Sequence, residues 1–198
     1  MATVPAPELL ADHLGNPKPR QDTTLTYEEA RLGVAFHEAG HAVLAMTYGF
    51  PVVSSEVIAW DMGQGGWGLT GNTVIGSGEV HAWRYAAMCA AGELANVRYL
   101  LVHGLWTPDR AAEITAEHDR ALAVDMLAAH GFSLGHDHVP AAGKSWGQVR
   151  GMAARKVDRL WREIRTVAHA MNESTKLTGE QIAAMTGLTN APMAGGAV

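Results

Sequence analysis

Apolar residues between positions 27 and 48 recur at spacings that cover more than one side of a helix. Thr26, followed three residues later by Glu29, is a capping box and predicts where this helix begins. Gly49 and Pro51 predict where it ends. The apolar members are Leu32, Val34, Ala35, Phe36, Val43, Leu44 and Met46. We therefore predict a buried helix from about Tyr27 to Tyr48.

The pattern then changes to short strands and returns to helices. Strands are predicted near Ser55–Trp60 and Trp67–Val74, with glycine-rich turns between them. Further helices are predicted at Glu79–Val102, from Thr107–Pro108 to Gly131, at Gln148–Met171, and after a cap formed by Thr178 and Gln181, while residues 132–147 are predicted to be a loop. The fold class is thus mainly α with a small β-sheet (α+β): a helical bundle with an edge-strand hairpin.

Length and composition favour a single domain. A chain of 198 residues with 47% hydrophobic composition can bury one core and is too short for two ordinary domains. Four prolines in the first 19 residues predict a flexible extension over residues 1–24. The small, glycine-rich stretch at 189–198 is expected to be a flexible tail. The folded domain is therefore placed at 25–188.

The net charge of the chain narrows the class of partner. Fifteen basic against 20 acidic residues give a net charge of −5, which argues against nucleic acid as a partner. Arg155, Arg159, Arg162 and Arg165 are interpreted as a solvated helix face opposite Trp161 and Ile164.

No apolar run of 18 residues is present, so no membrane span is expected. Cys89 is the only cysteine and lies in an apolar stretch, which favours a core position over a nucleophile. With no signal-peptide pattern at the start, a cytoplasmic location is expected.

The segment His37-Glu38-Ala39-Gly40-His41 carries the clearest chemistry. On a helix, positions 37 and 41 lie one above the other, so both imidazoles can reach one metal ion. Glu38 falls beside that face and can act as a general base without being a ligand. This zincin-like HExxH helix predicts one Zn²⁺ per chain.

A catalytic zinc site usually has three protein ligands, so one ligand is missing from the histidine pair. Asp119 is one candidate, because its predicted helix packs inward and a charged residue near that face needs a partner. Glu93 is another, since it is embedded among alanines and leucine. The cluster His136-Asp137-His138 is the third, although Gly135 and Pro140 place it in a loop, where exposed His and Asp are ordinary.

The stretch from Val34 to Val43 resembles the zinc-binding helix of FtsH-type peptidases, the proteolytic domains of membrane AAA+ proteases. Weaker similarities continue over residues 27–188, at Ser54–Trp60, Gly65–Thr70, Ala90–Ala95, Glu117–Ala121 and Leu160–Leu188. The resemblance implies that Asp119 is the third metal ligand.

The chain also departs from that family. Gly143-Lys144-Ser145 ends like a Walker A loop, but His138 stands where the first glycine is required. The resemblance therefore implies a free-standing peptidase domain, and either a separate ATPase partner or a homo-oligomer stays open. We expect a zinc-dependent metalloendopeptidase, ATP-independent on its own, that cleaves flexible or unfolded polypeptides.

Two other functions are compatible with the sequence. One is a zinc hydrolase of a small amide or modified peptide, and the other is a catalytically silent regulatory or binding module. The intact Glu38 argues against the silent module. The glycines at 65, 66 and 68 suggest an edge strand that pairs with an extended substrate, and the alternative is a plain hairpin turn with Trp67 covering the core.

Overall fold

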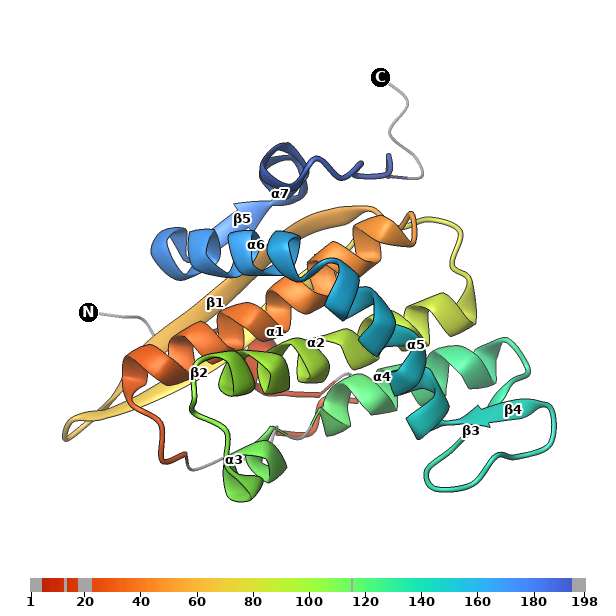
Figure 1. Ribbon diagram of the computed structural model, residues 1–198, viewed down its shortest axis with the longest axis horizontal. Helices are drawn as coiled ribbons and strands as arrows, with labels where there is room; N and C mark the ends of the chain where they lie inside the picture. The colour runs from red at the N-terminus through yellow and green to blue at the C-terminus, as the bar shows by residue number, and fades with distance from the viewer. Residues whose placement is uncertain (1–4, 13, 18–22, 115, 194–198) are drawn as a thin grey trace.

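The computed structural model describes residues 5–12, 14–17, 23–114 and 116–193 and is mainly helical with a small sheet, which confirms the predicted α+β class (Figure 1). The helices are η1 (Pro7–Leu10, a 3-10 helix), α1 (Tyr27–Thr47), α2 (Ala82–Val102), α3 (Pro108–Glu113), α4 (Glu117–Ala129), α5 (Trp146–Arg159), α6 (Trp161–Ser174) and α7 (Gly179–Thr186). The strands are β1 (Val52–Gly63), β2 (Gly66–Ile75), β3 (Ser133–Gly135), β4 (Gly143–Ser145) and β5 (Lys176–Thr178).

Helix α1 is the central element of the molecule. It begins at the predicted capping box, in which Thr26 and Glu29 each bond the backbone N–H of the other. It then runs between the β1–β2 hairpin, α2 and α6 (Figure 1). The Phe36 ring stacks on Tyr99 of α2 at 4.9 Å and on Trp161 of α6 at 5.1 Å. The core therefore forms around α1 and joins the first and last thirds of the chain.

Small residues let α1 and α2 touch through their backbones. A Cβ at Gly40 would lie 2.6 Å from the carbonyl oxygen of Ala91 and 2.9 Å from Cβ of Ala95. No side chain larger than hydrogen fits there without moving one helix. This close approach brings α2 directly against the histidine face of α1.

The three-stranded sheet has the order β2-β1-β5, and all its pairs are antiparallel. Gly63, Gln64 and Gly65 adopt positive φ and form the turn that joins β1 to β2. Strand β2 lies at the edge of the sheet, as predicted, and η1 packs against it. Trp67 at the start of β2 meets Tyr27 of α1 edge to face at 5.6 Å.

Two predicted helices are each broken in two. The segment predicted from Thr107 to Gly131 forms two helices, α3 ending at Glu113 and α4 beginning at Glu117. The one predicted at Gln148–Met171 is interrupted at Leu160, which caps both α5 and α6. This break lets α5 pack on α2 while α6 packs on α1. Tertiary packing has overridden a helical pattern that is continuous in the sequence.

The stretch predicted as a loop at 132–147 contains the short parallel pair β3 and β4. Glycines permit it, because a Cβ at Gly143 would collide with the carbonyl oxygen of Ser133. Strand β5, which was not predicted, adds to β1 through only three residue pairs. Such short strands carry little pattern of their own.

Both predicted flexible ends contain described structure. Residues 7–10 of the predicted extension form η1, and Ala11 bridges to Pro17. In the predicted tail, the Asn190 amide donates to the carbonyl oxygen of Val52 at 2.9 Å and accepts from its N–H at 2.8 Å. Residues 1–4, 13, 18–22 and 194–198 lie outside the described part of the chain.

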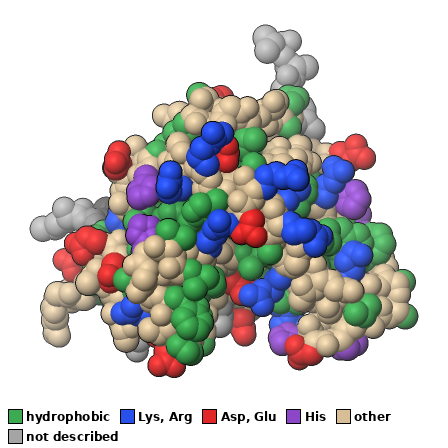
Figure 2. Space-filling view, viewed as in Figure 1, with side chains coloured by type: hydrophobic (Ala, Val, Ile, Leu, Met, Phe, Trp, Pro, Cys, Tyr) green, Lys and Arg blue, Asp and Glu red, His purple; other side chains and the backbone are tan. Residues whose placement is uncertain are grey.

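The surface agrees with two further predictions. Arg155, Arg159, Arg162 and Arg165 are all exposed, whereas Ile164 is buried. Figure 2 shows basic side chains spread over the face formed by α5 and α6. Within the described residues, no helix is both long and apolar enough to cross a membrane.

Candidate metal centre

Helix α1 presents His37 and His41 one turn apart on the face that meets α2. Their Nε2 atoms are 2.9 Å apart, and the two rings are nearly perpendicular, at 77°. The helix needs no distortion to achieve this, because residues four apart lie on the same face. The predicted histidine pair is therefore in place.

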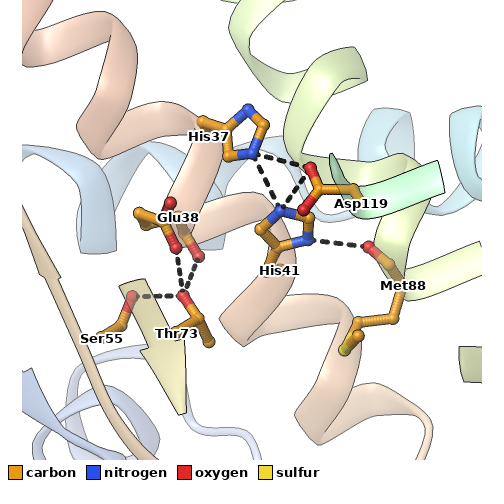
Figure 3. A network of polar contacts seen from close by, with 7 residues as sticks. All are labelled: His37, Glu38, His41, Ser55, Thr73, Met88 and Asp119. Carbon is orange, nitrogen blue, oxygen red and sulfur yellow. Dashed lines mark hydrogen bonds and ion pairs between the residues drawn. The ribbon is translucent and has the colours of Figure 1, made fainter. Parts of the chain in front are cut away.

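Asp119 approaches the same point from α4. Its Oδ2 lies 3.0 Å from Nε2 of His37 and 3.2 Å from Nε2 of His41 (Figure 3). The side chains of His41, Asp119 and His37 are 8%, 14% and 21% exposed, so the cluster is closed on the His41 side and opens to solvent beside His37. Residues from α1 and α4 thus converge on one point.

The three ligand atoms fit a metal ion. Among the described residues, this is the one group of three or more His, Cys, Asp or Glu side chains whose ligand atoms gather within 4.8 Å. Tetrahedral ligands at 2.0–2.1 Å from zinc are about 3.3 Å apart, close to the separations found here. Two imidazoles and one carboxylate are also a usual donor set for a catalytic zinc ion, which leaves one position open.

Gly92 of α2 provides the space beside these atoms. A Cβ at this position would lie 2.4 Å from Nε2 of His41 and 2.5 Å from Nε2 of His37. Any side chain at 92 would therefore occupy the volume next to both ligand nitrogens. The glycine keeps open the place where an ion would sit.

The carbonyl of Met88 orients His41. It lies 2.9 Å from Nδ1 of the ring, so the Nδ1–H donates to it. That bond leaves the Nε2 lone pair directed at the cluster when the imidazole is neutral. An outer hydrogen bond of this kind is a regular feature of metal-bound histidines.

Without a metal, the cluster forms a buried ion pair. Burial lowers the pKa of His41, but the Asp119 carboxylate outweighs this effect and raises the pKa to about 9. Burial likewise raises the pKa of Asp119, and the two histidines outweigh it and hold that pKa well below its usual range. In the metal-free protein near neutral pH, a proton on His41 therefore balances the Asp119 charge, and a metal ion would displace that proton.

Glu38 is buried, at 6% exposed, and its carboxylate turns toward the hairpin (Figure 3). The Thr73 hydroxyl of β2 donates to its Oε2 at 2.6 Å. Ser55 of β1 lies next in line, with its Oγ 2.8 Å from Oγ1 of Thr73. The carboxylate thus sits between the histidine helix and the edge strand.

The other predicted candidates have different partners. Glu93 forms an ion pair with Arg150 at 2.8 Å, and burial raises its pKa although Arg150 lowers it. His136 and Asp137 pair with each other at 2.7 Å and are exposed. Cys89 is buried, and burial raises the pKa of its thiol well above the usual value, which suits a core residue.

The sequence did not reveal the residues that surround the HExxH motif. In the hairpin, Thr73 bonds Glu38, Ser55 bonds Thr73, and Gly71 leaves room for the Glu38 carboxylate. Gly92 of α2 leaves room beside the two histidines. Gly68 and Gly71 leave room for the side chains of Trp60 and Glu38 of the same chain, rather than for the backbone of a bound peptide. The available signal was the same-face spacing of 71 and 73 in a predicted strand, which points to a shared neighbour without naming it.

Comparisons with known proteins add no family to this picture. No family model matches the chain, and no curated protein matches its sequence. The interpretation of the site rests on the positions and chemistry of the residues described above.

Proposed function

We propose that this chain is a zinc-dependent metalloendopeptidase of the FtsH type that cleaves flexible or unfolded polypeptides. The observation that carries the proposal is the convergence of His37, His41 and Asp119 on one point, with Glu38 on the same helix as the two histidines. Both features belong to hydrolytic zinc sites: three protein ligands with an open position, and a nearby carboxylate that is not a ligand.

The three ligand residues would hold the ion. When bound, zinc supplies a Lewis acid that polarises the scissile carbonyl and lowers the pKa of a water molecule toward about 7. Glu38 accepts the proton of the attacking water and then delivers it to the leaving amine. Burial of His41 and Glu38 keeps bulk water away from the reacting groups on one side.

Strand β2 supports a polypeptide as the substrate. It is an edge strand, and its Gly71 and Thr73 contact Glu38, so the strand passes directly beside the general base. An extended peptide that paired with this edge would place its backbone near the metal centre. Pairing through the main chain would also make binding tolerant of substrate sequence.

The test combines metal analysis with a peptide-library digest. We expect one zinc per chain and cleavage at peptide bonds. Two histidines and a carboxylate also bind Fe(II) in oxygenases, so metal content is measured before activity. Iron in place of zinc, or turnover of a small amide without peptide cleavage, would contradict the proposal.

Glu38→Gln separates catalysis from metal binding. The amide keeps the shape of the side chain and loses the base, so we expect the rate to fall by about 10²- to 10⁴-fold while zinc stays bound. Atomic absorption and a fluorogenic peptide assay measure the two quantities on one sample. Unchanged turnover would remove Glu38 from the mechanism.

Substrate state and location complete the proposal. With no ATPase motif in the chain, we propose that it cuts an unstructured polypeptide much faster than a tightly folded one and does not respond to ATP. A separate ATPase or self-association would then deliver folded substrates. We also propose a cytoplasmic location, supported by a single cysteine that is buried and unpaired in the folded chain.

A further inference from the structure

The Glu38 carboxylate is held by the hairpin rather than by α1 or by the metal ligands. Its Oε2 receives a bond from Thr73 Oγ1 at 2.6 Å, and Thr73 Oγ1 also lies 3.3 Å from the backbone oxygen of Glu38. Ser55, which is fully buried, is the cross-strand partner of Thr73 in the β1–β2 register. Two hydroxyls and one carboxylate thus form a line from the sheet to the candidate base.

The direction of these bonds follows from counting protons. The Thr73 hydroxyl has one proton, and an ionised carboxylate is its strongest acceptor at the shortest distance. Ser55 Oγ also lies 3.7 Å from Sδ of Met171, but a thioether is a weak acceptor, so its proton goes to the nearer Thr73 oxygen. Ser55 therefore donates to Thr73, and Thr73 donates to Glu38.

Gly71, two positions before Thr73 on β2, determines where the other carboxylate oxygen of Glu38 can lie. Residues 71 and 73 lie on the same face of the strand because side chains alternate. A Cβ at Gly71 would lie only 2.3 Å from Oε1 of Glu38, so this oxygen occupies space that the glycine leaves empty. One oxygen is thus fixed by a hydrogen bond, and the other lies where the neighbouring strand position must be glycine.

We propose that Thr73 is a positioning residue for Glu38 and that Ser55 fixes the Thr73 hydroxyl. By holding Oε2, the hydrogen bonds from Ser55 to Thr73 and from Thr73 to Glu38 prevent rotation of the carboxylate and so fix its orientation when it accepts a proton from the attacking water. This inference rests on the proposed role of Glu38 as general base. It gives β2 a second task, since the strand that would bind substrate also orients the group that acts on it.

The matched variants are Thr73→Val and Thr73→Ser. Valine fills the volume of threonine without a hydroxyl, and serine keeps the hydroxyl. We expect Thr73→Val to lower kcat by about 10- to 100-fold, the range for loss of a hydrogen bond to a charged group, with KM within about twofold of the wild type. Thr73→Ser should recover most of the rate, and Ser55→Ala should show a smaller loss. Zinc content should stay at one per chain in all three.

A double-mutant cycle with Glu38→Ala supplies a readout that does not depend on activity. Thr73→Val should lower the melting temperature on the order of 5 °C when Glu38 is present, because a buried carboxylate loses its donor. In the Glu38→Ala background the same substitution should change the melting temperature by less than half as much. Equal shifts in both backgrounds, or equal rates for Thr73→Val and Thr73→Ser, would overturn the proposal. If the wild type binds zinc but cleaves no peptide, the proposed function fails, and the thermal cycle still decides whether Thr73 acts on Glu38.

Discussion

Helices α1 and α4 supply ligand atoms to the same point, yet they are held in the molecule very differently. Helix α1 begins with a complete capping box and has twelve buried residues, with α2, α6 and the hairpin packed around it. Helix α4 has no side-chain cap and only two buried residues, Ala123 and Leu127, and it packs mainly on α2. The two histidines are therefore preorganised by the core.

Asp119 depends on a weaker attachment. It lies in the first turn of α4, a helix that follows the interruption after Glu113 and has no side-chain cap at its start. In the metal-free protein, its contacts with His37 and His41 fasten this end of α4 to α1. A bound ion would replace them with stronger bonds. One half of the site is thus built by packing and the other half by the ligands themselves.

Gly92→Ala should break the preorganised half and produce the largest effect. The added methyl would lie 2.4–2.5 Å from both ligand nitrogens, so we expect zinc affinity to fall by at least about 100-fold and activity to be lost. Isothermal titration with zinc measures the first quantity. Gly151→Ala is the matched control, since a Cβ on that helical glycine meets nothing within 4 Å and should leave affinity unchanged. Full zinc binding by Gly92→Ala would contradict the assigned metal position.

Asp119→Ala should remove the other half of the site and loosen α4 without loosening α1. We expect zinc content to fall sharply and amide exchange in α4 to accelerate, while exchange in α1 changes little. Mass spectrometry of exchanged peptides resolves the two helices. Glu93→Ala is the control and should retain the metal, because Glu93 pairs with Arg150. Loss of zinc in the control, with retention in Asp119→Ala, would reverse the ligand assignment.

The pH dependence of the metal-free protein gives a smaller effect. The folded pKa of His41 is about 9, against 6.5 for an ordinary histidine, so its stabilising contribution is fully present below pH 6.5 and is lost as the pH rises through 9. Because the pKa of Asp119 is lowered, the same ion pair is also lost as the pH falls below about 3.8. We expect the melting temperature in chelator to fall between pH 6.5 and 9.

Zinc should remove this alkaline loss, because ligand histidines must be neutral and metal binding strengthens as the pH rises. Melting curves from pH 6 to 9.5, with chelator and with zinc, measure the difference. Two parallel curves would show that protons and the metal do not compete for the same histidine nitrogens.

Local signals in the sequence were enough for α1 and for the first half of the site. The capping box and Gly49 placed the helix within one residue of its observed ends, and the four-residue spacing placed the histidines on one face. The break at Leu160 was not predictable in this way, since it depends on the packing of α5 on α2 and of α6 on α1.

The surroundings of the motif depend on register and on the distance between helices. Thr73 meets Glu38 only because β1 and β2 pair in one particular register. Gly92 matters only because Gly40 lets α2 approach α1 so closely. A single sequence contains neither of these distances, so the motif was visible and its supporting residues were not.

The sandwich of Phe36 between Tyr99 and Trp161 also has a consequence for the order of events during synthesis. An emerging chain carries both histidines early, but α1 cannot bury its core face until Trp161 has left the ribosome. Asp119 likewise arrives roughly 80 residues after His41. The proposed peptidase site, assembled from distant parts of the chain, would stay incomplete during synthesis and would form only when folding is almost complete.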